Sequence, residues 1–167
     1  MKAALLCNGP SRVAFNSRLG YNYVIGCNIP WTEVDSTVIY DIGVLQYLKD
    51  NGIKPTPFWT TEHAWKKASS KYRDYVISDL LGILKTNPTG DSSGHMACRK
   101  LIELGYKEID IYGCDSWWQN DTTSYTHQYV DGNKESRDSN IKRWRNMWET
   151  IIKSNQDVKI NFIGEPK

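Results

Sequence analysis

Residues 92–115 read SSGHMACRKLIELGYKEIDIYGCD, and the fold class can be predicted from them. Ser92 or Ser93 provides the N-cap that a helix needs, and a glycine at 105 follows its predicted end. Apolar residues recur on one face of this helix, at Ala97, Leu101 and Leu104. A short apolar strand comes next, at 108–112. A helix that leads within a few residues into a short apolar strand is the repeating unit of a parallel sheet.

Further segments of the same kind lie on both sides of this unit. They carry β-branched or aromatic residues and are bounded by turn residues. The expected strands are Lys2–Cys7, Tyr23–Cys27, Thr37–Asp41, Pro57–Thr60, Glu108–Tyr112 and Lys159–Ile163. The expected helices are Gly43–Asp50, Ser92–Leu104 and Ser136–Lys153. This alternation predicts an α/β protein with a Rossmann-like three-layer fold, in which helices flank a mostly parallel central sheet.

Two segments call for a separate interpretation. Residues 62–85 have helical patches and no clear strand, so we expect helix there. On the last predicted helix, Lys142, Arg143 and Arg145 lie beside the apolar stripe. We interpret these three cations as a solvent-exposed helix face, because charged side chains seldom lie inside a protein.

The composition is that of an ordinary globular protein, with 40% hydrophobic and 24% charged residues. A chain of 167 residues fits one domain, which we expect to cover 1–167. The formal net charge of +2 does not indicate a nucleic-acid partner. No apolar run approaches the roughly 20 residues of a membrane span, and the first residues do not resemble a secretory leader. The four cysteines stand singly, which argues against zinc and for a reducing, cytoplasmic location.

Polar side chains follow four of the predicted strands at their carboxyl ends. They are Asn8, Asn28, Asp41 and Asp115. Ligands of open parallel sheets bind outside the carboxyl ends of the strands, and Asn and Asp side chains can bind ribose hydroxyls or base edges. One such residue would be explained by a turn, whereas four at equivalent places predict a ligand-binding site.

Two short segments have the composition of anion-binding loops. Residues 8–11, Asn-Gly-Pro-Ser, match neither the dinucleotide fingerprint nor the phosphate loop of NTPases. Gly9 nevertheless allows a ligand to approach the backbone, and the Ser11 hydroxyl can bind a phosphate or carboxylate. Ser92, Ser93 and Gly94 open a helix, where amides and hydroxyls can hold an anion. A plain turn and an ordinary N-cap are the respective alternatives.

The loop at 115–129 mixes aromatic and hydroxyl-bearing side chains after a predicted strand. Long loops of this kind are often functional, so we expect a lid or a ring-binding surface. A surface for a protein partner is the alternative.

These motifs together resemble the bacterial sialyltransferases of lipooligosaccharide synthesis, which depend on CMP-sugars. The matching segments are Asn8–Ser11, Cys27–Asn28, Ser92–Gly94 and Leu104–Tyr125. They occur in the family's order, and the chain resembles a shortened and divergent relative. A pterin pyrophosphokinase-like group shares the first loop and the Ser-Gly helix start.

The resemblance implies a Rossmann-type transferase whose nucleotide-sugar donor is a substrate, with no cofactor and no metal. It places Asn8, Ser11, Asn28, Asp41, Ser92, Ser93 and Gly94 at the nucleotide. Gly9 and Asp115 join this set from the loop chemistry above.

The family's catalytic residues are matched only in part. Two of its tyrosines donate to the leaving phosphate, and Tyr125 matches one while Trp118 stands at the other. The family's base is a histidine, at whose position this chain has Glu135; His127 is the other candidate base.

Three functions remain open. The first is a glycosyltransferase-like enzyme with an unidentified acceptor, and the second is a nucleotide-binding protein without catalysis. The third is a pterin or nucleotide pyrophosphokinase, which would need a metal held by acidic residues such as Asp41, Asp91 and Asp115. Self-association is compatible with each of them.

Overall fold

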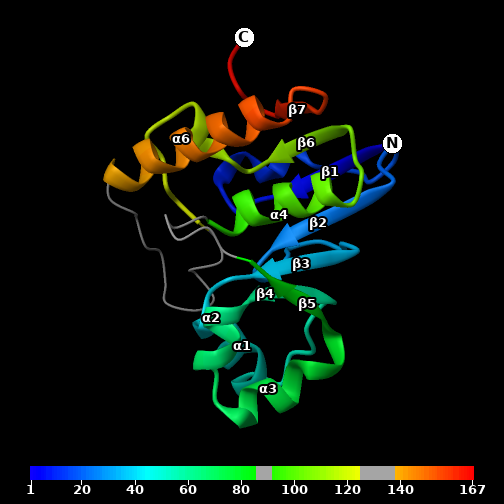
Figure 1. The fold of residues 1–167 in the computed structure, drawn as a ribbon, viewed down its shortest axis with the longest axis vertical. Coiled ribbons are helices and arrows are strands. Elements are labelled where there is room, and N and C mark those ends of the chain that lie inside the picture. The colour runs from blue at the N-terminus through cyan, green and yellow to red at the C-terminus, as the bar shows by residue number, and fades with distance from the viewer. Residues whose placement is uncertain (86–91, 125–137) are drawn as a thin grey trace.

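The structure is a computed structural model that describes residues 1–85, 92–124 and 138–167, with side chains from residue 140 onward in the last segment (Figure 1). Tyr125, His127 and Glu135, which the sequence predicts as site residues, lie outside the described residues. Within the described ranges, no helix is long and apolar enough to cross a membrane.

A parallel sheet of seven strands runs through the described chain, in the order β5-β4-β3-β2-β1-β6-β7. The strands are β1 (Lys2–Leu6), β2 (Tyr23–Cys27), β3 (Ser36–Ile39), β4 (Phe58–Thr61), β5 (Leu80–Leu84), β6 (Glu108–Tyr112) and β7 (Lys159–Phe162). The chain winds outward from β1 to β5 and then crosses to β6 on the other side of β1. The strand order therefore reverses between β1 and β6, which is where open α/β sheets bind ligands.

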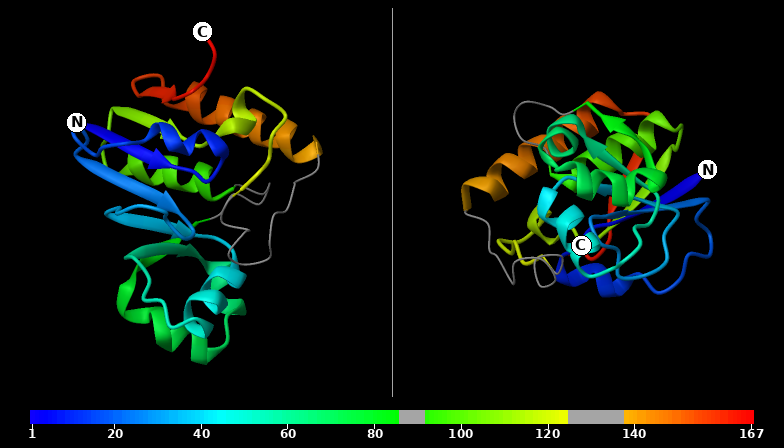
Figure 2. Two further views of the ribbon diagram at one scale, coloured as in Figure 1. Left: turned by 180° about the vertical axis from the view of Figure 1, so that it is seen from behind. Right: turned by 90° about the horizontal axis from the view of Figure 1, so that it is seen from below.

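Helices cover both faces of the sheet (Figures 1 and 2). They are α1 (Ile42–Asp50), α2 (Glu62–Lys67), α3 (Ser70–Val76), α4 (Ser93–Glu103) and α6 (Asp138–Ser154), with short 3-10 turns η1 (Pro10–Ala14), η2 (Ile77–Asp79) and η3 (Asp115–Trp117). Helix α4 lies across β1, β2 and β3, and α6 packs beside it. Helices α1 to α3 gather near β4, at the lower end of the view in Figure 1.

Alternate residues of β1 enter different cores, as the period of a strand requires. Ala3 and Leu5 face α4 and α6, whereas Ala4 and Leu6 face a second core that residues 10–34 cover with Phe15, Tyr21, Trp31 and Val34. The predicted α/β class with a Rossmann-like three-layer arrangement is thus confirmed, and the described strands are all parallel. The predicted helices and strands agree with these bounds to within one or two residues where they are described.

The expectation of helix throughout 62–85 is wrong, because β5 forms the edge of the sheet there. An edge strand packs on one neighbour only, and Leu81 and Ile83 are 50% and 45% exposed. The sequence Leu-Leu-Gly-Ile-Leu consequently has no alternation of polar and apolar residues that would distinguish it from the end of a helix.

The loops after β1 and β6 approach each other closely through two glycines. The Gly9 amide donates to the Gly113 carbonyl at 2.8 Å. A Cβ at Gly9 would lie 2.4 Å from an Asp115 carboxylate oxygen, and one at Gly113 would lie 2.5 Å from the Cys7 carbonyl oxygen. Gly113 also has a φ of +72°, which side chains disfavour. Only glycines fit this crossing.

We expect Gly113→Ala to destabilise the fold more than Gly52→Ala does. Gly52 has a φ of +63° but no atom within 4 Å of an added Cβ, so its variant pays mainly the conformational cost of about 1–2 kcal/mol. Gly113→Ala adds the backbone clash, worth about 1–3 kcal/mol more. Urea unfolding measures the free energy of unfolding of both variants. An equal decrease in the two variants would contradict the close approach of the two loops.

Candidate functional site

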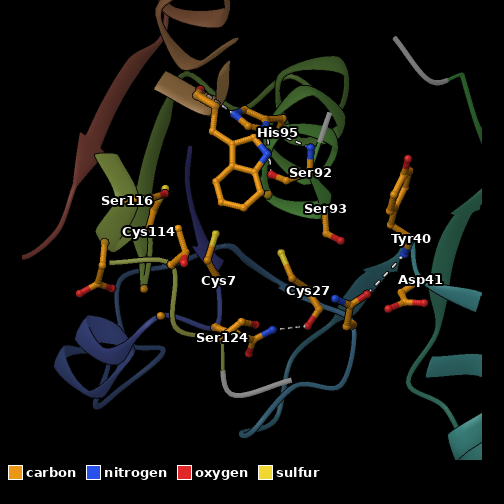
Figure 3. Close-up of a pocket in the computed structure, with 18 of the residues that line it drawn as sticks. Cys7, Cys27, Tyr40, Asp41, Ser92, Ser93, His95, Cys114, Ser116 and Ser124 are labelled. Atoms are coloured by element: carbon orange, nitrogen blue, oxygen red, sulfur yellow. Dashed lines mark hydrogen bonds between the residues drawn. The ribbon is translucent and has the colours of Figure 1, made fainter. Parts of the chain in front are cut away.

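A cavity of about 570 Å³ opens at the carboxyl ends of β1, β2, β3 and β6 (Figure 3). The first turn of α4 and residues of α2 and α6 complete its wall. The size is that of a small-molecule site. Eight of the residues predicted from the sequence line it together: Asn8, Gly9, Asn28, Asp41, Ser92, Ser93, Gly94 and Asp115. Ser11 and Trp118 are not among its lining residues.

Asn8 fixes the spacing of the first two strand ends. Its side chain is buried, its Nδ2 donates to the Cys27 carbonyl at 2.9 Å, and its Oδ1 accepts from Arg12 Nη1 at 3.3 Å. The amide therefore holds β1 and β2 together at the base of the cavity.

Asn28 is the one described non-glycine residue with a positive φ, at 56°. Its Oδ1 accepts from the Tyr40 amide at 3.4 Å, and no hydrogen bond of its Nδ2 is found within the described chain. A left-handed residue costs of order 1 kcal/mol and concentrates at functional sites. This conformation leaves Nδ2 as a donor for a ligand at the cavity.

Asp115 and Ser11 are bonded to each other. The buried Asp115 carboxylate accepts from the Ser11 hydroxyl at 2.8 Å, from the Ser11 amide at 3.1 Å and from Gln119 Nε2 at 3.0 Å. Ser11 thus holds the loop after β6 in place through these hydrogen bonds. The Trp118 ring lies against Gly164, 3.4 Å from the place of an added Cβ.

The start of α4 is fixed by a capping box between Ser92 and His95. His95 is fully buried; its Nε2 lies 3.0 Å from the Trp144 carbonyl oxygen, and its Nδ1 lies 3.1 Å from the Ser92 amide. Because a carbonyl only accepts, Nε2 carries the proton and Nδ1 accepts from Ser92. Burial lowers the pKa of His95 to about 4, so the ring is neutral at pH 7.

Ser93, the first residue of α4, also faces the cavity. Ser93 extends from the start of α4 into the space between α4 and the Tyr40–Asp41 turn (Figure 3). No hydrogen bond of its hydroxyl is found within the described residues. Asp41 itself caps α1, accepting from the Gly43 amide at 2.9 Å.

Three cationic or titratable side chains at the cavity were missed from the sequence. His63 and Lys67, one turn apart on α2, and Arg143 on α6 line its rim and are exposed. The i, i+4 spacing of His63 and Lys67 was the available signal, but it needed α2 to be placed beside the strand ends.

The interpretation of the α6 cations as a solvated face is wrong for Arg145. Its Nε donates to the Ser116 carbonyl at 2.7 Å, and its Nη2 donates to the Gln119 carbonyl at 3.0 Å. Arg145 therefore ties α6 to the loop after β6, because a planar guanidinium can satisfy several carbonyls at once.

Among the residues that the structure describes, no group of three or more His, Cys, Asp or Glu is arranged to hold a metal ion. Asp41 and Asp115 have the partners given above, and Asp91 falls outside the described ranges.

Solved structures similar to this chain include sialyltransferases. The sialyltransferase CstII in complex with a trisaccharide acceptor and CMP matches with a TM-score of 0.59 at 18% identity, over 98% of this chain and 81% of the other. CstII from Campylobacter jejuni in complex with the substrate analogue CMP-3FNeuAc matches with a TM-score of 0.57 at 16% identity, over 98% and 80%. At these identities the likeness shows a shared sialyltransferase-like fold.

A probable thiamine pyrophosphokinase from Staphylococcus saprophyticus matches more loosely, with a TM-score of 0.45 at 17% identity over 98% of this chain and 65% of the other. No protein-family model matches the chain, and no curated protein matches its sequence.

The buried neutral His95 predicts a pH dependence of stability. Its folded pKa, about 4, lies below the usual value of 6.5, so the unfolded chain binds the extra proton between these limits and stability falls as pH drops through them. His95→Gln retains a capping side chain without titrating. Between pH 7 and pH 5, the free energy of unfolding measured in urea should fall by about 2 kcal/mol more for the wild type than for the variant. Equal losses would mean that folding does not lower the pKa of His95.

Proposed function

We propose that this chain is a glycosyltransferase-like protein that binds a nucleotide-sugar of the CMP-sugar type and transfers its glycosyl group to an acceptor. The observation that carries the proposal is the convergence of four polar strand ends and one helix start on a single cavity. The sialyltransferase-like fold supports it, because the similar structures hold CMP and a CMP-sugar analogue.

The phosphate is assigned to the first turn of α4. Amides at a helix start favour an anion, and the Ser93 hydroxyl adds a donor. Lys67 and Arg143 on the rim supply positive charge for a phosphate or for an acidic sugar.

The nucleoside is assigned to the ends of β2 and β3. The Nδ2 of Asn28, which has no hydrogen bond within the described segments, can donate to a base carbonyl, and Asp41 can offer a carboxylate oxygen to a ribose hydroxyl. Amide and carboxylate groups at neighbouring strand ends suit a ligand with both a base and a sugar.

In the transfer, the acceptor oxygen forms a bond to the anomeric carbon while the bond between this carbon and the phosphate oxygen breaks, and CMP leaves. By the family resemblance, Tyr125 donates a hydrogen bond to this phosphate, and His127 or Glu135 takes the proton of the acceptor hydroxyl. Four cysteines without a disulfide agree with a cytoplasmic location.

Calorimetry should show CMP binding more tightly than UMP, GMP or ATP. Arg143→Gln should weaken CMP binding about tenfold, or about 1.4 kcal/mol, because it removes a rim cation. Lys142→Gln is the matched control, since Lys142 is exposed on the same helix and does not line the cavity. Equal effects of the two variants, or no preference among the nucleotides, would argue against the proposed donor site.

Incubation with a CMP-sugar, followed by NMR, should show hydrolysis of the donor above the uncatalysed rate. His127→Ala should reduce transfer to an added acceptor at least tenfold if His127 is the base. Full turnover by that variant removes His127 from the mechanism and leaves Glu135→Gln to be tested in the same way.

A nucleotide-binding protein without catalysis is the second candidate. It is favoured by Trp118, whose position corresponds to a phosphate-binding tyrosine of the family but whose ring lies against Gly164 instead of lining the cavity. CMP binding without any donor hydrolysis would select this candidate.

A further inference from the structure

The cysteines that stand apart in the sequence gather at the base of the cavity. Cys7, Cys27 and Cys114 follow or end three adjacent strands and all line the cavity (Figure 3). Cys7 shares sulfur hydrogen bonds with both of the others. No disulfide joins them. The sheet therefore places one half-buried thiol between two buried ones.

The backbone brings these thiols within reach of a covalent bond. Leu6 and Gly26 are register partners on β1 and β2, and Cys7 and Cys27 are the residues that directly follow this pair. Neighbouring strands lie about 4.8 Å apart, which falls within the Cα separation that a disulfide spans. On the other side, the Cys7 amide donates to the Tyr112 carbonyl, two residues before Cys114.

The Cys7 sulfur also lies beneath the first turn of α4. A Cβ on the buried Gly94 would lie 3.0 Å from this sulfur, so a glycine makes room for it there. Amides at a helix start stabilise a thiolate. Hydrogen bonds from Cys114 and Cys27 lower the pKa of Cys7 well below its usual value, although its burial and the nearby Asp115 carboxylate act against this.

The neighbouring thiols have the opposite character. Their hydrogen bonds to Cys7, together with burial, raise the pKa values of Cys27 and Cys114. Cys98, fully buried on α4, has its pKa raised by burial to about 12. Cys7 is thus distinguished from the other three thiols by exposure, by partners and by its place at a helix start.

We propose that Cys7 is an oxidant-sensitive modification site at the base of the cavity, whose reaction with a small hydroperoxide ends in a disulfide to Cys27 or Cys114. The inference rests on the cavity and the thiols and does not require the proposed transferase activity.

The reaction has two balanced steps. The Cys7 thiolate attacks one oxygen of hydrogen peroxide, the O–O bond breaks, and hydroxide leaves to be protonated by solvent, which gives a sulfenic acid. A neighbouring thiol then loses its proton and attacks this sulfur; the S–S bond forms, the S–O bond breaks and water leaves. Overall, two thiols and one hydrogen peroxide give one disulfide and two waters.

The test uses the full chain, reduced and then treated with hydrogen peroxide at pH 7. Remaining thiols are alkylated after denaturation and counted by mass spectrometry, and peptide mapping identifies the bond. We expect the loss of two thiols per chain and a bond from Cys7 to Cys27 or Cys114. A bond between Cys27 and Cys114, or one between two chains, would overturn the proposal.

Two variants separate Cys7 from a general sensitivity of the protein. Cys7→Ser should slow the loss of thiols at least tenfold, whereas Cys98→Ser should leave the rate unchanged. Equal rates in all three proteins would refute the assignment. If Cys7→Ser does not fold, the native wild type is instead alkylated briefly with less than one equivalent of N-ethylmaleimide. The proposal then requires that Cys7 is labelled before the other three cysteines. The assay contains no nucleotide, so failure to bind CMP would not affect its result.

Discussion

The crossing of the loops that follow β1 and β6 is the constraint on which the cavity depends. These two strands are direct neighbours in the sheet. The strands β2 to β5 are added on one side of β1, and β6 and β7 are added on its other side. Gly9 and Gly113 let their backbones approach, and the Asp115 carboxylate then accepts three hydrogen bonds from Ser11 and Gln119. The same residue, Asp115, lines the cavity together with the start of α4. A looser crossing would leave Asp115 partly unpaired, which is costly for a buried charge.

The rim of the cavity is held by a different kind of contact. Arg145 bonds to two carbonyls of the loop after β6, and the His95 ring joins the start of α4 to the Trp144 carbonyl of α6. Helix α6 is thereby fixed both to this loop and to α4. The rim residue Arg143 belongs to the same helix, so its position is set by contacts that are independent of any ligand.

Much of the fold was accessible from the sequence, because buried parallel strands and capped helices leave local signals. The polar strand ends could also be recognised, since one rule of parallel sheets predicts where they meet. The edge strand β5 could not, because half of its side chains are exposed. The orientation of Ser11 toward Asp115 and the contribution of α2 to the rim depend on packing between segments far apart in the chain. The clustering of Cys7, Cys27 and Cys114 depends on strand order, which single cysteines do not reveal.

The position of β1 in the middle of the sheet has a consequence for folding. Its residue Lys2 is paired with Glu108, so one side of this strand remains without a neighbour until about a hundred further residues have been synthesised. Pairings over such a sequence separation form slowly, because the chain loses loop-closure entropy before the strand contacts form. On the ribosome, the strands β1 to β5 can form a partial sheet early. Until β6 is synthesised, one edge of β1 has no strand to pair with. A chaperone that covers unpaired strand edges would therefore protect this chain from aggregation mainly midway through its translation.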